Sequence, residues 1–202
     1  MNGFPIAVFL SGSGTTLQNL IDCQNAGTLP IQIVQVIASK PGVLGIERAQ
    51  KAGLPIEVVS RKAFASLEEY SDCLFEKCRH AGAKLVCLAG FLQLVRIPPD
   101  FAHRVLNIHP SLLPAFGGKG MFGHHVHEAV LAAGAKVSGC TVHFADNEFD
   151  HGPIVLQRTV PVLEDDTPEA LAARIFKEEC EAYPEAIRTI ISRSRLRARP
   201  ND

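Results

Sequence analysis

The order of apolar segments constrains the fold of this chain more than any other feature. Short runs rich in β-branched residues alternate with longer helix-like stretches through the first half of the sequence. Uninterrupted apolar runs are typical of strands buried on both faces, and their alternation with helices predicts a parallel sheet with crossover helices. The predicted strands lie near residues 5–10, 31–39, 56–59, 84–89 and 104–109.

Two later apolar runs follow a different pattern. VSGCTVHFA and IVLQRTVPV flank DNEFDHGP, residues 146–153, whose Asp, Asn, Gly and Pro favour a turn. We therefore expect antiparallel strands at the end of the sheet. A last helix is predicted from about 166–168, and its apolar stripe includes Glu179. Because burying a lone carboxylate is costly, Glu179 needs a partner or a polar ligand.

Composition limits the class of protein. The chain has 202 residues, which fit one domain, and no linker or repeat divides it. A net charge of -1 argues against nucleic acid as the main partner, because such proteins concentrate Lys and Arg. The six cysteines lack disulfide spacing and are interpreted as reduced thiols. No leader and no apolar run of about 18 residues is visible, so we expect a cytoplasmic protein without a membrane partner.

The segment SGSGTTLQNL, residues 11–20, is a candidate anion site. Its glycines follow the first strand and lead into a helix expected from Leu17. Backbone N–H groups at a helix start, together with the helix dipole, suit a phosphate group. The segment lacks the Lys of a P-loop and the third Gly of a dinucleotide site. A monophosphate ester is therefore favoured as the ligand, and a purely structural turn with a Ser or Thr cap stays open.

The segment NIHPSLLP contains the strongest candidates for catalysis. Asn107 and His109 are two residues apart on a strand and so point to the same face, and Pro110 ends the strand. Ligands of open α/β sheets gather at the carboxyl ends of strands. Asp150 is either a turn cap or a carboxylate that pairs with His109, raises its pKa and favours the protonated ring. With Asn107 as a further N–H donor, the three residues suit an oxyanion.

Three histidines in GHHVHEAV, namely His124, His125 and His127, raise the alternative of a metal site. Their spacing lacks the i, i+4 face of a zinc protease helix, and no acidic ligand is fixed beside them. No metal is therefore predicted, and a structural or substrate-closing role is favoured.

Taken together, the segments resemble the phosphoribosylglycinamide formyltransferase family, the folate-dependent enzymes of purine biosynthesis. The resemblance covers nearly the whole chain, and it rests on the order of five segments. These are SGSGTTLQNLID, LAGFLQLV, NIHPSLLPAF, GCTVHFADNEFDHGPIVLQ and DTPEALAARIFKEECEAYP. It implies an α/β domain over residues 1–192, with a Rossmann-like, mostly parallel sheet, helices on both faces and an antiparallel C-terminal hairpin. Residues 193–202 are expected to form a disordered basic tail.

The resemblance also implies a reaction, in which a formyl group passes from 10-formyltetrahydrofolate to the amine of glycinamide ribonucleotide. Asn107, His109 and Asp150 match the family's catalytic trio. The co-substrate is the folate, and no metal is needed. A related formyltetrahydrofolate hydrolase and a folate- or nucleotide-binding module without turnover are the alternatives. The sequence leaves open whether the protein is a monomer or a homodimer.

The family's binding residues carry over by position. The nucleotide is expected at Gly14, Thr15, Thr16, Pro110 and Glu179, with Glu179 on the ribose hydroxyls. The folate is expected at Leu92, Gln93, Leu94, Val95, Asp146, Asn147 and Glu148. This chain departs from the common pattern at Thr16, where relatives carry Asn, and at Gln93, where they carry Arg. The link FGGKGMFGHHVH is longer than in many relatives, and its glycines suggest a mobile flap over the nucleotide.

Overall fold

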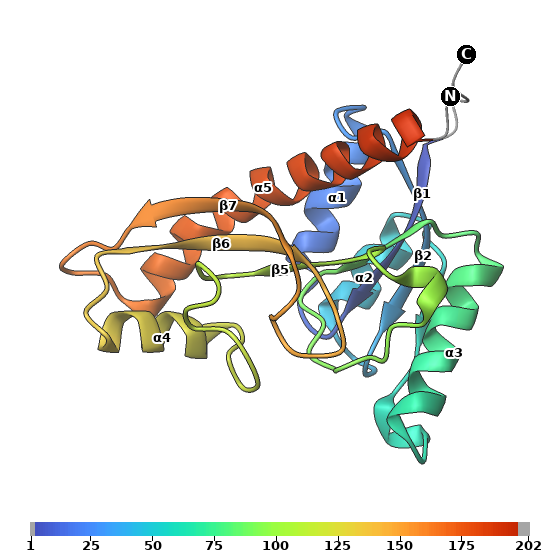
Figure 1. The fold of residues 1–202 in the computed structure, drawn as a ribbon, viewed down its shortest axis with the longest axis horizontal. Helices are drawn as coiled ribbons and strands as arrows, with labels where there is room; N and C mark the ends of the chain where they lie inside the picture. The colour runs from blue at the N-terminus through green and yellow to red at the C-terminus, as the bar shows by residue number, and fades with distance from the viewer. Residues whose placement is uncertain (1–2, 198–202) are drawn as a thin grey trace.

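The computed structural model describes residues 3–197, which fold around one seven-stranded sheet (Figure 1). The strands are β1 Phe4–Leu10, β2 Ile31–Ala38, β3 Ile56–Val58, β4 Leu85–Leu88, β5 Val105–His109, β6 Val137–Phe144 and β7 Ile154–Pro161. Their order across the sheet is β3-β2-β1-β4-β5-β6-β7. The first five strands are parallel, whereas β6 and β7 are antiparallel to their neighbours. The predicted mixed sheet with an antiparallel end is confirmed.

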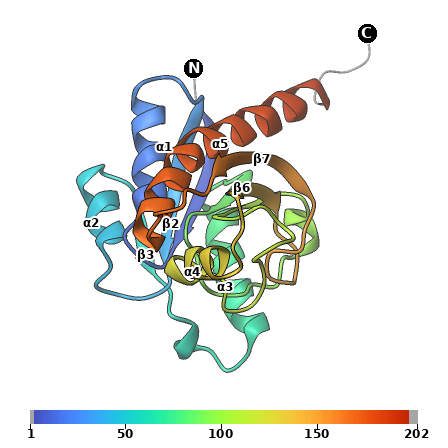
Figure 2. The same ribbon diagram turned by 90° about the vertical axis from the view of Figure 1, so that its left-hand side faces the viewer.

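Helices cover both faces of this sheet (Figure 2). They are α1 Thr15–Asn25, α2 Leu44–Lys51, α3 Leu67–His80, α4 His124–Ala132 and α5 Pro168–Arg197, with 3-10 turns at Arg61–Ala63 and Pro99–Phe101. Alternate residues of β1 enter different cores, with Val8 on one face and Phe9 on the other. The core on the Val8 face is completed by α1, α2, α4 and α5, and the core on the Phe9 face by α3.

The first helix begins at Thr15, two residues before its predicted start. Gly14 is its N-cap with φ 72, and no side chain makes a capping hydrogen bond, so the alternative of a turn with a Ser or Thr cap is not supported. A Cβ atom at Gly14 would lie 2.6 Å from the Cα atom of Gly45. The glycine is therefore required both by its left-handed backbone and by the close approach of α2.

The last helix follows its predicted start closely. Thr167 caps α5 because its Oγ1 accepts a hydrogen bond from the N–H of Ala170 at 3.2 Å. The helix then continues to Arg197, past residue 193 where the sequence places the start of a tail, and residues 198–202 lie outside the described part of the chain. Among the helices of residues 3–197, none has the length and apolar character to cross a bilayer.

The segment after β5 is held by hydrogen bonds from the antiparallel strands. Thr141 on β6 donates through Oγ1 to the carbonyl of Ser111 at 2.6 Å and accepts from the N–H of Leu113 at 3.0 Å. Gln157 on β7 donates to the carbonyl of Leu113 at 3.0 Å. These contacts fix the segment from Ser111 to Leu113 against β6 and β7.

Candidate active site

A cavity of about 590 Å³ opens at the carboxyl ends of β4 and β5, beside the start of α1. Its wall includes Gly90 after β4, Asn107 and His109 on β5, and Thr15 on α1. The strand order reverses between β1 and β4, and ligands of open α/β sheets bind at such a switch point. The sheet therefore places the candidate residues where a ligand is expected.

Asn107 is the centre of a small hydrogen-bond network. Its Nδ2 lies 3.0 Å from Nε2 of His143 and donates to Oδ1 of Asp150 at 3.3 Å. Since an amide nitrogen only donates, the contact with Asp150 fixes the orientation of the side-chain amide. Asn107 and Asp150 come from β5 and from the loop between β6 and β7, and the fold brings them together as the sequence predicts.

His109 has an oxygen atom next to each ring nitrogen. Its Nε2 lies 2.8 Å from the carbonyl oxygen of Phe116, and its Nδ1 lies 3.4 Å from Oδ2 of Asp150. A carbonyl oxygen only accepts, so Nε2 carries a proton and donates it. The protonated ring alone offers a donor to both oxygens. His109 is, however, only 3% exposed, which disfavours the charged form.

The pKa of His109 shifts in the opposite direction to the one predicted from the sequence. Burial holds the pKa of His109 below its usual value, and the charge of Asp150 and the carbonyl of Phe116 raise the pKa by less than burial lowers it. Asp150 therefore acts in the predicted direction, but the net shift is downward. A ligand that supplies negative charge would restore the imidazolium form.

Asp150 is held in place from three sides. Its backbone has φ 55, a left-handed conformation uncommon for residues other than glycine. Oδ2 accepts the N–H of Gly118 at 3.0 Å, and Oδ1 lies 3.7 Å from Nε2 of His143. Burial raises the pKa of Asp150, but His143, the charge of His109 and the Gly118 N–H together lower it further, so the pKa lies below its usual value. The carboxylate is therefore ionised at neutral pH.

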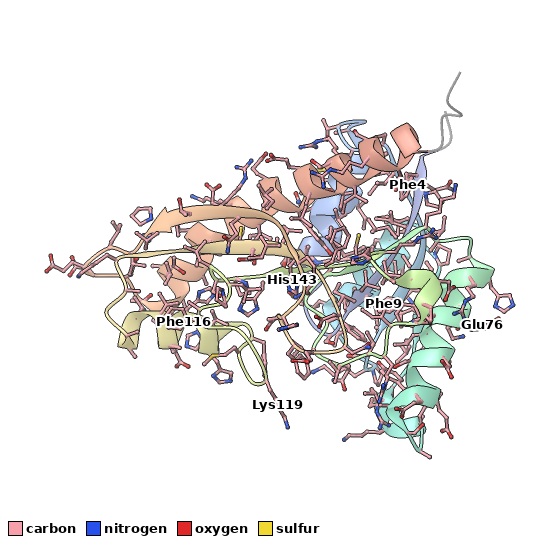
Figure 3. The ribbon with its side chains drawn as sticks, viewed as in Figure 1. Phe4, Phe9, Glu76, Phe116, Lys119 and His143 are labelled. Atoms are coloured by element: carbon pink, nitrogen blue, oxygen red, sulfur yellow. The ribbon has the colours of Figure 1, made fainter. Side chains whose placement is uncertain are left out.

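His143 is a site residue that the sequence prediction missed. It is the cross-strand partner of Asn107 in the antiparallel β5–β6 register, and it is 1% exposed. Figure 3 labels it near the centre of the molecule, on β6. Its Nδ1 lies 3.0 Å from the carbonyl oxygen of Phe144. Only the register of the two strands would reveal it, because VHF carries no other sign of function.

All but one of the residues predicted to bind the nucleotide line the cavity. These are Thr15, Thr16, Pro110 and Glu179, whereas Gly14, the N-cap of α1, does not line it. Burial raises the pKa of Glu179 to about 7, from an ordinary value of 4.5. Glu179, on the apolar stripe of α5, thus borders the cavity, where a polar ligand can reach it.

Of the residues predicted to bind folate, only Leu92 lines the cavity. Leu92 lines the cavity, and its N–H donates to Oγ of Ser11 at 2.9 Å. Val95 is 3% exposed and belongs to the core on the α3 face. The remaining predicted residues, namely Gln93, Leu94, Asp146, Asn147 and Glu148, do not line the cavity either.

The loop from 145 to 150 is nevertheless held by hydrogen bonds of its own side chains. Asn147 accepts the N–H of Ile97 at 2.9 Å, which joins this loop to the segment after β4. Asp146 accepts the N–H of Glu148 at 2.8 Å. These residues shape the loop that carries Phe149 and Asp150, and both of those side chains line the cavity.

The long glycine-rich link covers part of the cavity. Residues 118–123 all line it, and the sequence patterns alone single out none of Lys119, Met121 and Phe122. In Figure 3, Lys119 lies at the tip of the yellow-green loop with its side chain directed away from the sheet. The loop is anchored by Phe116 and Gly118, whose backbone groups contact His109 and Asp150. We refer to residues 116–123 as the flap.

The three clustered histidines have different surroundings. His124 and His125 are exposed at the start of α4, and each lies 3.3 Å from a carboxylate oxygen of Glu128. His127 is buried and lines the cavity. No group of His, Cys, Asp and Glu among residues 3–197 has the arrangement of a metal site.

The fold and the cavity define a class of protein: an open α/β sheet with one site at its switch point, where acid–base groups and a helix start meet. None of the described residues lining that site is Ser or Cys. A family model described as formyl transferase matches residues 4–187. The chain therefore belongs to the formyl transferase family.

Solved structures and curated sequences agree with this assignment. A glycinamide ribonucleotide transformylase from Symbiobacterium toebii is 44% identical, with a TM-score of 0.85, and the match covers 93% of this chain and 87% of that one. A phosphoribosylglycinamide formyltransferase from Bacillus halodurans is 35% identical, also with a TM-score of 0.85, over 94% and 96% of the two chains.

A curated relative is much longer than this chain. A trifunctional purine biosynthetic protein from Drosophila melanogaster is 43% identical over 95% of this chain, but the match spans only 14% of that protein. The match to a chloroplastic phosphoribosylglycinamide formyltransferase from Vigna unguiculata is 39% identical and spans 60% of its length.

Proposed function

We propose that this protein transfers a formyl group from 10-formyltetrahydrofolate to the amine of glycinamide ribonucleotide. The products are formylglycinamide ribonucleotide and tetrahydrofolate, and the reaction belongs to purine biosynthesis. The observation that carries the proposal is the convergence of Asn107, His109 and Asp150 on one wall of the cavity that also holds Thr15 and Glu179. Family membership and the names of the similar solved structures support it.

The arrangement suits direct attack of one substrate on the other. The amine attacks the formyl carbon, and negative charge develops on the formyl oxygen. One N–H of Asn107, which contacts His143 or Asp150 in the absence of a ligand, turns to this oxygen. His109 supplies a second donor, so that polar groups already in place stabilise the tetrahedral intermediate. Asp150 holds the imidazolium and accepts a proton from the attacking amine. The proton then passes to the departing folate nitrogen, and no covalent enzyme intermediate forms.

The internal hydrogen bonds of His109 favour the transition state over the bound substrate. In the absence of a ligand the donor at Nε2 is occupied by the carbonyl of Phe116. A neutral formyl oxygen competes weakly for that donor, whereas an oxyanion makes a charge-assisted bond of about twice the strength. Because the gain appears only as charge develops, it lowers the barrier rather than the KM.

Substrates divide between the two ends of the cavity in this proposal. The phosphate lies at the start of α1 by Thr15 and Thr16, the ribose hydroxyls meet Glu179, and the folate lies by Leu92 and Phe149. A helix start with free backbone N–H groups suits the phosphate. The remaining predicted folate residues, from Gln93 to Val95 and from Asp146 to Glu148, support the loops around this end. Cytoplasmic location and assembly as a monomer or homodimer stay predictions.

Tetrahydrofolate formation, followed by absorbance with and without glycinamide ribonucleotide, tests the proposal. We expect formation that depends on the nucleotide and saturates with it. Equal rates in its absence would instead identify a formyltetrahydrofolate hydrolase, in which water takes the place of the amine. Binding of both molecules without any product would identify a module without turnover.

A further inference from the structure

The mechanism above uses none of the clustered histidines, and His127 is the buried member of that cluster. It is 5% exposed, and it lines the cavity. Its Nδ1 atom is buried and has no hydrogen-bond partner among residues 3–197. A buried polar atom without a partner is destabilising, and such atoms are rare in native proteins. Packing alone would favour an apolar side chain at this position, so the histidine points to a function for its other nitrogen, Nε2.

Among the described side chains, none makes a carboxylate contact with His127. Glu128, the adjacent acidic residue, lies 3.3 Å from both His124 and His125, on the exposed side of α4. Burial holds the pKa of His127 below its usual value, and the positive charges of His124 and His109 lower it further. At neutral pH the ring is therefore uncharged, and it carries one proton.

The surroundings of Nδ1 decide where that proton lies. A buried N–H without an acceptor is less tolerable than a buried lone pair without a donor. Since Nδ1 has no partner, the proton belongs on Nε2, the ring atom farther from the backbone. His127 thus offers one neutral donor at the wall of the cavity. A neutral donor suits a carbonyl oxygen better than a phosphate, which Thr15 and the start of α1 already serve.

The position of His127 limits which carbonyl it meets. It lines the same cavity as His109 and Glu179. It belongs to α4, which shares a core with α5, the helix that carries Glu179. In the reaction proposed above, the part of the nucleotide that joins the ribose to the reactive amine spans these two positions. That part is the glycinamide arm, and its amide has one carbonyl oxygen.

We propose that Nε2–H of His127 donates a hydrogen bond to the amide carbonyl of the glycinamide arm and thereby orients the attacking amine. This inference rests on the proposed function, since the arm belongs to that substrate. His127 is then a binding residue for the amine substrate. It acts on the nucleotide and has no role toward the folate.

Three substitutions at one position test the assignment. Gln places an amide nitrogen near the position of Nε2, Asn places one near Nδ1, and Leu places none. We expect His127→Leu and His127→Asn to raise the KM for glycinamide ribonucleotide about 10-fold, the loss of one neutral hydrogen bond. His127→Gln should stay within about threefold of the wild type. The KM for formyl-folate should not change in any of them, and His124→Leu, on the exposed side of the same helix, is the matched control.

Two further measurements separate binding from folding. His127→Leu should unfold at the same temperature as the wild type or above it, because an apolar side chain replaces a buried atom without a partner. Ribose 5-phosphate, which lacks the glycinamide arm, should inhibit wild type and His127→Leu equally. Weaker inhibition of the variant would overturn the assignment to the amide, as would an unchanged KM for the nucleotide in His127→Leu.

The role of His127 and the proposed function can fail separately in these measurements. If the wild type forms tetrahydrofolate only with the nucleotide and the three variants behave alike, the function stands and the role of His127 is wrong. If the wild type shows no nucleotide-dependent turnover, both are wrong.

Discussion

The carboxylate of Asp150 lies 3.4 Å from Nδ1 of His109, and the contact joins the β6–β7 loop to the end of β5. Both residues also hold the flap, because His109 donates to the carbonyl of Phe116 and Asp150 accepts the N–H of Gly118. The groups proposed to act on the substrate therefore also position the segment that covers it. Changes at either residue should affect chemistry and closure together.

The first prediction concerns the pH dependence of Asp150→Asn. The carboxylate raises the pKa of His109 against the effect of burial, so its replacement by an amide lowers that pKa further. Activity that needs the imidazolium is lost as the pH rises through this pKa. We expect the alkaline limb of kcat/KM to move to lower pH and the rate at pH 7.5 to fall about 10²-fold. A profile of unchanged shape, scaled by a constant, would contradict the role of Asp150.

The second prediction concerns stability at Glu179. Its pKa in the folded chain is about 7, above the ordinary 4.5, so the folded state disfavours the ionised carboxylate. This cost is absent below the unfolded pKa and fully present above the folded one. At pH 8, Glu179→Gln should therefore unfold at least about 2–4 °C above the wild type, which is about 1 kcal/mol after allowance for the open cavity.

The same substitution should weaken binding of the nucleotide. If Glu179 contacts ribose hydroxyls, Glu179→Gln raises the KM for glycinamide ribonucleotide while it stabilises the protein. Thermal unfolding at pH 5 and pH 8 provides the control, since the difference between variant and wild type should shrink at pH 5. An equal difference at both values would show that ionisation of Glu179 is not its cause.

The third prediction uses a glycine in the flap. A Cβ atom at Gly117 would overlap Cδ2 of Leu113 and lie 3.3 Å from Cβ of Asp150. Gly117 does not have the left-handed backbone that favours glycine, so the effect of Gly117→Ala is steric. We expect the methyl group to push the flap and Asp150 apart and to lower kcat about 10-fold, because catalytic geometry tolerates little displacement. Full activity in a folded variant would show that this contact does not position Asp150.

The sequence predicts the sheet and the placement of Asn107 and His109 at one strand end well, because both depend on local patterns. Apolar runs identify the seven strands, and a spacing of two places Asn107 and His109 on one face. Glu179 is identified as a candidate site residue because a carboxylate on the apolar stripe of a helix needs a polar partner. In each case the information lies within one segment of the chain.

What the sequence does not predict depends on contacts between segments. His143 enters the site through the β5–β6 register, and the carbonyl of Phe116 enters it through the closure of a loop. The downward pKa shift of His109 reflects burial by several elements, which no single motif encodes. Val95 illustrates the same limit, because an apolar residue after a strand is equally compatible with a ligand wall and with the core.

The central claim is that His109 and Asp150 act as one unit on the formyl oxygen and the attacking amine. The most direct measurement is kcat for His109→Ala, Asp150→Ala and the double variant, with circular dichroism to confirm the native fold. Each single substitution should cost at least about 10²-fold, and the double variant should lose little more than His109→Ala alone, because residues that act together are not additive. Losses that multiply in the double variant, or near-normal turnover in either single variant, would contradict the account.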